Sequence, residues 1–235
     1  MTPSVPSISA DTIRAIALML PALLLSLSVH EFAHAWMANR LGDDTAERQG
    51  RLTLSPASHV DVFGTIIFPL LLITTTGGVF GWAKPVPFNP ARFRRGVSMR
   101  GGAALTAAAG PLSNVALMVL CLMALFIAAR VGLDLNSSAG EMLFAGLSTM
   151  IVLNGILAVF NLIPLPPLDG SYLLPRSMDD FKERISGYSF LILLAVFLIP
   201  LPGIGTLGGI ILSPMLAALG WLVGWAMLPA LGGGV

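Results

Sequence analysis

Residues 15–34 read Ala-Ile-Ala-Leu-Met-Leu-Pro-Ala-Leu-Leu-Leu-Ser-Leu-Ser-Val-His-Glu-Phe-Ala-His, an apolar run that ends in three ionisable side chains. Two serines are the polar residues of the apolar part, so the stretch belongs in a lipid bilayer. On a helix, residues i and i+4 project from one face, which lets His30 and His34 bind a single metal ion. Glu31, one residue along, can then reach a water molecule bound to that ion. The stretch therefore predicts a zinc site inside a membrane.

The plain alternative is that these are ordinary buried side chains, with Glu31 paired to Arg14 or Arg40. Burying ionisable groups in hydrocarbon costs several kcal/mol unless another charge compensates them. A bound divalent cation provides that compensation. Two of the three histidines in the chain lie in this one motif, which favours the metal site.

Composition places the whole chain in the membrane. Hydrophobic residues make up 55% of the 235 residues and charged residues 11%, and the mean hydropathy is +0.85. Soluble domains carry about twice that share of charged residues. The net charge of +1 gives no basis for a nucleic-acid partner. A single cysteine, Cys121, excludes an intrachain disulfide and a zinc site built from cysteines.

Five long apolar runs predict an all-α polytopic membrane protein with about five transmembrane helices. The fourth run is short, and the runs lie at 13–41, 103–129, 142–163, 188–199 and 207–231. We expect one membrane domain over residues 1–235. Within it, a catalytic core at about 13–176 precedes a C-terminal helical hairpin at about 186–231.

Residues 62–76 are ambiguous, because they are apolar but shorter than the roughly 20 residues that a spanning helix needs. Gly64 and Pro69 also interrupt this segment, and proline weakens a helix interior. We predict a re-entrant segment that continues through the Gly- and Pro-rich residues 77–90 as short strands or an extended interfacial loop. A fully spanning helix is the alternative.

Positive charge predicts the orientation of the chain. Five basic residues and no acidic residue lie between Lys84 and Arg100, which is typical of a cytoplasmic loop. If residues 62–76 are re-entrant, the next two long helices go out and back. The chain after residue 163 then returns to the cytoplasmic half of the membrane, where the histidine motif lies.

A catalytic zinc ion usually has three protein ligands, so one more ligand is needed. Asp169 is the stronger candidate, since three prolines between residues 164 and 167 break the preceding helix and leave backbone at membrane depth,. A carboxylate suits zinc and partly neutralises its charge. Asp169-Gly170 is also a common turn dipeptide, which is the plain alternative.

His59 is the remaining histidine and lies in the polar loop at 42–60. A solvated or capping role is the simplest interpretation. Contact with a substrate or with the metal ligands comes second, and direct metal binding comes third. Because the second interpretation would place it at the site, His59 is included as a candidate substrate-binding residue.

These elements together resemble the site-2 protease family of intramembrane zinc metalloproteases, in a compact form without a PDZ domain. The resemblance rests on His-Glu-Phe-Ala-His, on Ala-Gly-Pro-Leu-Ser-Asn at 109–114 and on Asn161 to Gly170, with further likeness at 50–90. It covers about residues 20–176.

The resemblance implies one Zn²⁺ held by His30, His34 and Asp169, with Glu31 as general base on zinc-bound water. It also implies Asn161, at the start of the segment that carries Asp169, as a residue that holds the substrate backbone or the oxyanion. Asn114, which ends the second motif, is either a buried hydrogen-bonding residue or a secondary substrate contact.

The predicted function is hydrolysis of peptide bonds in or near transmembrane segments of membrane proteins. The partners are then a membrane-protein substrate and the lipid bilayer, in a prokaryotic cytoplasmic (inner) membrane, with the active site toward the cytoplasmic half. The alternative is a zinc-binding membrane transporter or a non-catalytic membrane scaffold, in which Glu31 carries a proton or binds an ion. A transporter would show more polar residues along a path, and the last two apolar runs offer almost none.

Overall fold

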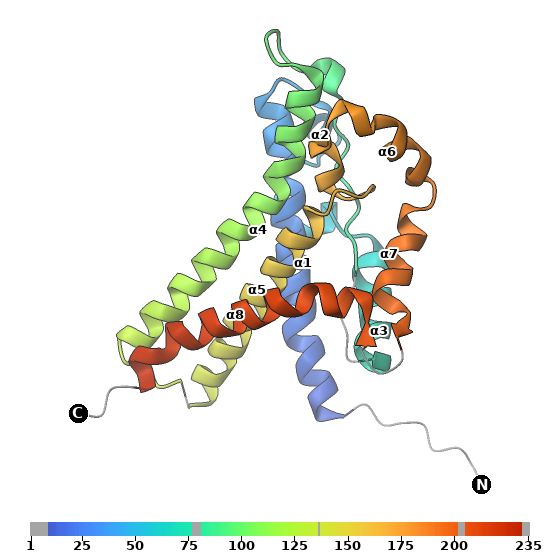
Figure 1. Ribbon diagram of the computed structural model, residues 1–235. Coiled ribbons are helices and arrows are strands. Elements are labelled where there is room, and N and C mark those ends of the chain that lie inside the picture. The colour runs from blue at the N-terminus through green and yellow to red at the C-terminus, as the bar shows by residue number, and fades with distance from the viewer. Residues whose placement is uncertain (1–8, 77–80, 136, 202–204, 232–235) are drawn as a thin grey trace.

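The computed structural model describes residues 9–76, 81–135, 137–201 and 205–231. Long helices form its centre, and shorter segments pack around them (Figure 1). Residues 77–80 of the predicted extended loop and residues 202–204 of the predicted hairpin turn lie outside the described part of the chain.

Within the described residues, four helices are long and apolar enough to cross a membrane. They are α1 (Ala10–Arg40), α4 (Met99–Arg130), α5 (Ser138–Asn161) and α8 (Leu207–Leu231), whose spanning part is Gly208–Met227. The prediction of an all-α polytopic membrane protein is thereby confirmed. The fourth apolar run forms α7 (Ser189–Leu198), a helix of 10 residues, which is shorter than a bilayer requires.

The remaining elements are short. They are α2 (Thr45–Arg48), α3 (Phe68–Thr76), α6 (Asp179–Ser186), the π-helix Val62–Ile67, the antiparallel pair β1 (Pro200–Leu201) and β2 (Gly205–Thr206), and four 3-10 helices at Pro56–Ser58, Pro90–Arg92, Asp169–Leu173 and Arg176–Met178.

Serine side chains set where the three central helices begin. The Ser9 side chain, just before α1, accepts a hydrogen bond from the Thr12 amide. The side chains of Ser98, before α4, and Ser137, before α5, each accept one from the amide three residues further along the chain. Each bond satisfies one of the amide groups that a helix start leaves without a helical partner. The helix starts are therefore encoded locally in the sequence.

The segment at 62–76 enters the molecule and returns to the end from which it came. After the π-helix and α3, an extended stretch at 81–89 runs back: the Trp82 amide donates to Gly64 O at 3.1 Å, and the Lys84 amide donates to His59 O at 2.9 Å. Figure 1 shows α3 far from the end where α2 lies. This hairpin, whose apolar part is shorter than the helices that could cross a membrane, fits the re-entrant prediction better than the spanning alternative.

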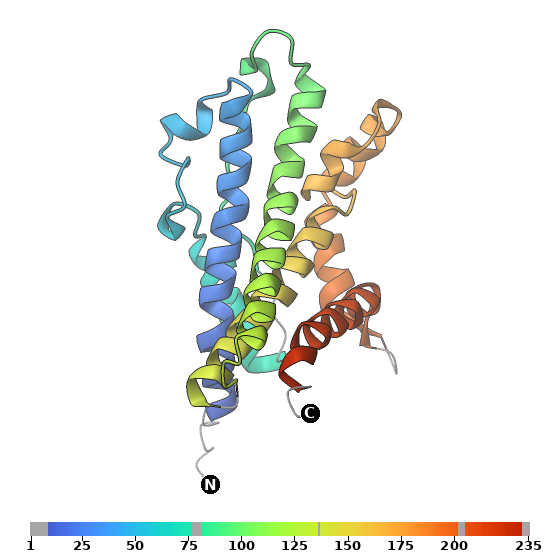
Figure 2. The same cartoon turned by 90° about the vertical axis from the view of Figure 1, so that its left-hand side faces the viewer.

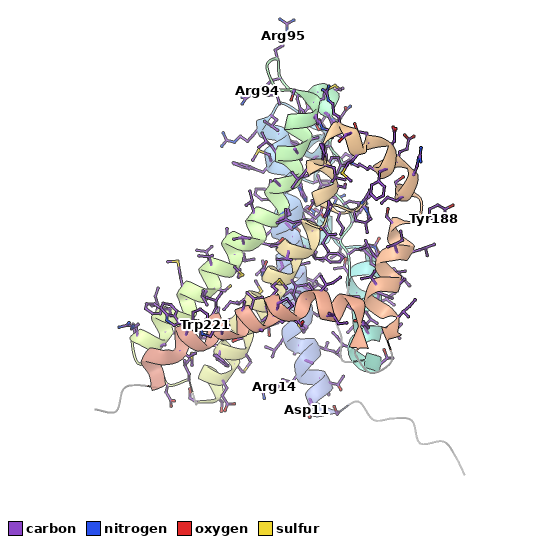
Figure 3. All side chains as sticks on the ribbon, viewed as in Figure 1. Asp11, Arg14, Arg94, Arg95, Tyr188 and Trp221 are labelled. Atoms are coloured by element: carbon purple, nitrogen blue, oxygen red, sulfur yellow. The ribbon has the colours of Figure 1, made fainter. Side chains whose placement is uncertain are left out.

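The ends of α1 and α4 show the same topology directly. The Arg94 amide, just before α4, donates to the carbonyl of Leu41, just after α1, at 2.8 Å. The two helices therefore run antiparallel, side by side (Figure 2). Figure 3 places Arg94 and Arg95 at this end of the molecule, and Asp11 and Arg14 at the opposite end.

Of the three apolar clusters among the described residues, two join the long helices to one another. One joins α1 to α5 and to the extended stretch, and the other joins α4 and α5 to α8. After the β1–β2 pair, α8 runs across α4 and α5 and diverges from α7 (Figures 1 and 2). Many outward-facing apolar side chains are exposed, Leu112 at 63% and Met142 at 68% among them, as expected of a surface that faces lipid.

Candidate metal centre

Three potential ligand atoms meet near the end of α1. The Nε2 atoms of His30 and His34 lie 3.0 Å apart, and Asp169 Oδ2 lies 3.1 Å from the first and 3.3 Å from the second. Ligands bound tetrahedrally at about 2.0–2.1 Å from zinc are themselves roughly 3.3–3.4 Å apart. The triangle therefore has the size that a zinc ion requires. Among the described residues, these three form a group that could hold a metal ion.

Hydrogen bonds on the far side of each ring fix which nitrogen faces the triangle. His30 Nδ1 lies 2.6 Å from Asn114 Oδ1, and His34 Nδ1 lies 2.7 Å from the carbonyl oxygen of Thr106. Both oxygens accept hydrogen bonds, so each Nδ1 carries the proton and each Nε2 presents a lone pair to the centre. Such an arrangement is the usual preparation of histidine for a metal.

The Asp169 carboxylate also indicates that the three side chains suit a bound cation. Its Oδ2 is buried and accepts no conventional hydrogen bond within the described residues. Two imidazole lone pairs and a carboxylate oxygen at this spacing repel one another unless a cation lies among them. The donor set, two nitrogens and one oxygen, is one that zinc accepts.

Gly110 of α4 makes room for the two rings. A Cβ atom at this position would lie 2.5 Å from His34 Cε1 and 2.7 Å from His30 Cε1. Carbon atoms in contact are ordinarily about 3.5–4.0 Å apart. The missing side chain thus allows both imidazoles to lie directly against the backbone of the neighbouring helix.

Glu31 is buried beside the triangle but is not part of the potential ligand group in the described residues. Its Oε2 accepts a hydrogen bond from the Val86 amide at 2.7 Å. The alternative partner Arg40 lies instead over the Trp36 ring, 5.2 Å from its centroid. The extended stretch therefore holds this carboxylate in place and leaves it without an arginine partner in the described part of the chain.

A cavity of about 360 Å³ opens next to His30 and Glu31. Its walls come from α1, the extended stretch, α5, the segment before Asp169 and α7, and most of the lining side chains are apolar: Leu27, Trp82, Ala83, Pro85, Leu157, Phe160, Pro167, Leu168 and Leu193. Asn161 also lines the cavity, and its amide nitrogen donates to Leu157 O at 2.9 Å. The structure thus places this predicted residue beside the candidate site.

The other two candidates are placed differently. Asn114 is fully buried, and its amide is engaged by His30 and Asn154, which fits the buried hydrogen-bonding interpretation. His59 is 1% exposed, so its side chain is not solvated. Its Nε2 lies 2.7 Å from the Thr53 carbonyl, and it does not belong to the potential ligand group in the described residues.

Sequence reasoning missed several residues that shape this site. They are Val86, which holds Glu31, Gly110, which admits the rings, and the pair Ser26 and Asn154, which lie behind Asn114. For Ser26 and Asn154 the available signal was a polar residue in the middle of an apolar helix, because such residues are costly in a membrane and tend to have a role there.

A protein of Bacillus subtilis (strain 168), named "Putative zinc metalloprotease YwhC", is 38% identical to this chain over 200 residues. The match covers 83% of this chain and 84% of that protein. The chain belongs to this zinc metalloprotease family. No family model matches the chain, and no solved structure matches it.

Two mycobacterial relatives carry the same description with the name Rip2. The protein of Mycolicibacterium smegmatis is 30% identical over 208 residues, which is 82% of this chain and 73% of that protein. The protein of Mycobacterium tuberculosis (strain ATCC 25618 / H37Rv) is 32% identical over 184 residues, which is 75% of this chain and 65% of that protein. Together with the three-residue group, these relatives confirm the expected zinc cofactor and a metalloprotease class for this membrane protein.

Proposed function

We propose that this chain is an intramembrane zinc metalloprotease of the site-2 protease type, which hydrolyses peptide bonds in or near transmembrane segments of other membrane proteins. The observation that carries the proposal is the ligand triangle formed by His30 and His34 of the long apolar helix α1 and by Asp169 of the 3-10 helix that follows α5, with Glu31 beside it at the wall of an apolar cavity. When bound there, zinc would supply the Lewis acidity that activates water and polarises the scissile carbonyl.

Glu31 is the proposed general base. Its carboxylate is positioned by the Val86 amide and faces the cavity. It accepts the proton of the attacking water and later delivers a proton to the leaving nitrogen.

The extended stretch at 81–87 is the proposed binding edge for substrate. The amides of Trp82, Lys84 and Val86 all face the protein, where Gly64, His59 and Glu31 accept them. Since backbone groups alternate along an extended chain, the groups of residues 83 and 85 face the other way, and both residues line the cavity. A substrate segment that has locally unwound from its helix could pair with this edge.

The proposed position of the site is the cytoplasmic half of a prokaryotic inner membrane. His34 lies six residues before the end of α1, which is about 9 Å along the helix axis. The basic residues Arg94 and Arg95 lie at that same end (Figure 3), as the positive-inside rule expects of the cytoplasmic face.

Replacing Glu31 with glutamine tests the proposal. The amide oxygen of the introduced glutamine can still accept the Val86 hydrogen bond, so we expect the variant to fold and to keep zinc. Without a base, cleavage should fall by at least about 100-fold. Glu141→Gln, at an exposed position at the start of α5, is the matched control and should retain full cleavage.

The assay compares the membrane proteomes of cells that produce the wild type, Glu31→Gln or Glu141→Gln. Single-span proteins that accumulate only with Glu31→Gln are the expected substrates, and their cleavage is then measured with purified enzyme. Retained cleavage by Glu31→Gln would remove the proposed base. A transporter or a scaffold would give three indistinguishable proteomes.

A further inference from the structure

A buried chain of polar side chains leads away from the metal centre into the helix bundle. Asn114 of α4, Asn154 of α5 and Ser26 of α1 are each 0% exposed. Asn114 Nδ2 donates to Asn154 Oδ1 at 2.7 Å and, over a longer distance, to the Ser26 backbone carbonyl at 3.4 Å. Asn154 Nδ2 donates to Ser26 Oγ at 2.9 Å and to the backbone carbonyl of Met150 at 2.8 Å. Polar groups with this burial are costly in a membrane unless they are fully paired.

The Met150 carbonyl, at the end of this hydrogen-bonded row farthest from the metal centre, determines which group donates in each of the other bonds. The Met150 carbonyl can only accept, so the amide nitrogen of Asn154 must face it. The Asn154 oxygen then faces Asn114 and requires the amide nitrogen of Asn114 opposite it. This leaves the Asn114 oxygen to face His30, where it accepts the proton on Nδ1.

We propose that Asn154 is a positioning residue that sets the tautomer of His30 through Asn114. His34 needs no such relay, because a backbone carbonyl, Thr106 O, accepts its Nδ1 proton directly at 2.7 Å. Both histidines are thus oriented by a backbone carbonyl of a neighbouring helix, one directly and one through two asparagines. The inference rests on the proposed zinc site, since only an Nε2 lone pair can bind the ion at the triangle.

Loss of Asn154 removes the shorter of the two hydrogen bonds that hold Asn114 in this orientation and leaves the 3.4 Å bond from Asn114 Nδ2 to the Ser26 backbone carbonyl. An Asn114 amide that turns over presents Nδ2 to His30, which then has to accept at Nδ1 and carry its proton on Nε2. That tautomer cannot bind the metal. Ser26 matters less, because Asn154 keeps the Met150 carbonyl as an acceptor when the serine hydroxyl is absent.

The primary test is the zinc affinity of the purified full chain, measured by competition with a chelator. Asn154→Leu should bind zinc about 10- to 100-fold more weakly than the wild type, as is typical when a partner of a metal ligand is removed. Thr149→Val is the matched control: the Thr149 hydroxyl donates to Ala145 O in its own helix at 2.8 Å and has no path to His30. This control should stay within about threefold of the wild type. Equal affinity of Asn154→Leu and Thr149→Val would overturn the inference.

A carboxylate at position 114, whose two oxygens are equivalent, separates the proposed relay from a merely structural role of Asn154. The carboxylate of an Asn114→Asp variant accepts the His30 proton with either oxygen, so it needs no orientation by residue 154. In the Asn114→Asp background the Asn154 oxygen faces a carboxylate oxygen, and this contact between two hydrogen-bond acceptors is unfavourable. Asn154→Leu should therefore strengthen zinc binding when residue 114 is aspartate and weaken it when residue 114 is asparagine. A change of the same sign in both backgrounds would refute the relay.

Thermal unfolding of the zinc-free proteins shows whether each variant folds. Asn154→Thr is the second variant should Asn154→Leu fail, because its hydroxyl can donate to Met150 O as Thr149 does to Ala145 O. Its zinc affinity should exceed that of Asn154→Val, which has the same shape and no hydroxyl, and equal affinities would contradict the inference. His30→Ala separates the two proposals. If it loses zinc while the Asn154 variants do not, only the relay fails, and if it binds zinc like the wild type, the proposed site and the relay fail together.

Discussion

Replacing Gly110 with alanine should weaken the metal centre while leaving all three proposed ligands in the sequence. The added methyl group would lie 2.5 Å from His34 Cε1 and 2.7 Å from His30 Cε1. Since carbon atoms in contact need about 3.5–4.0 Å, the two rings must withdraw by roughly 1 Å. Metal–ligand distances tolerate only about 0.2 Å, so the rings cannot withdraw and still complete the triangle.

The size of the effect follows from the cost of overpacking. Forcing a methyl group into a filled site typically costs about 1–3 kcal/mol. Here the strain is greatest when the rings occupy the binding position, so it weakens zinc binding. At 1.4 kcal/mol for each factor of ten, zinc affinity should fall roughly 5- to 140-fold. Cleavage at limiting zinc should fall in parallel.

Gly146→Ala is the matched control for this experiment. Gly146 lies in α5, and apart from the backbone of its own helix no atom of the described residues lies within 4 Å of a Cβ built on it. Alanine there should leave zinc binding unchanged and, by its higher helix propensity, raise stability by up to about 1 kcal/mol. Zinc affinity is measured by chelator competition in micelles, with thermal unfolding of the zinc-free proteins as the check on folding. A Gly110→Ala protein with wild-type zinc affinity would refute the packing of the two rings against α4.

Three further changes probe other parts of the site. Asp169→Asn keeps the shape of the ligand but removes the charge that offsets the ion, so bound zinc measured after dialysis should fall well below one ion per chain; full occupancy would exclude Asp169 as a ligand. Pro85→Ala combined with Pro87→Ala loosens the extended stretch and places new amide donors on its cavity side, and should slow cleavage without loss of zinc; unchanged cleavage would count against this binding edge. The orientation of the protein in the membrane is tested with a single cysteine in place of Arg95 or Asp11, in a Cys121→Ser background. A thiol reagent that cannot cross membranes should label the Asp11 position in intact cells, and the Arg95 position only after the cells are permeabilised. The reverse labelling would place the site in the outer half.

The parts of the site that depend on local geometry could be predicted from the sequence. The i, i+4 spacing of His30 and His34 is a property of one helix, so it was evident before any packing was known. The prolines before Asp169 marked a break at membrane depth, and the re-entrant topology brought that break to the correct end. The shortness of residues 62–76 was the decisive clue to the topology.

The contacts between distant segments could not be predicted in the same way. Asn154 pairs with Ser26 across 128 positions in the sequence, and Val86 holds Glu31 across 55 positions. No periodicity links such pairs, because their meeting depends on how helices pack and on which rotamers fit. The course of α8 across α4 and α5 is similar: the sequence predicted a C-terminal helical hairpin, but the direction in which α8 leaves is set by packing in the cluster that joins it to α4 and α5.

X-ray absorption at the zinc edge tests the metal centre most directly. The purified wild-type chain should hold one zinc ion with nitrogen and oxygen ligands at about 2.0–2.1 Å and with the outer scattering of imidazole. His30→Ala and Asp169→Asn should each lose the ion or change this spectrum, while Gly146→Ala should reproduce it. A sulfur ligand at about 2.3 Å, or a spectrum that does not change when His30 is removed, would contradict a zinc site built from His30, His34 and Asp169.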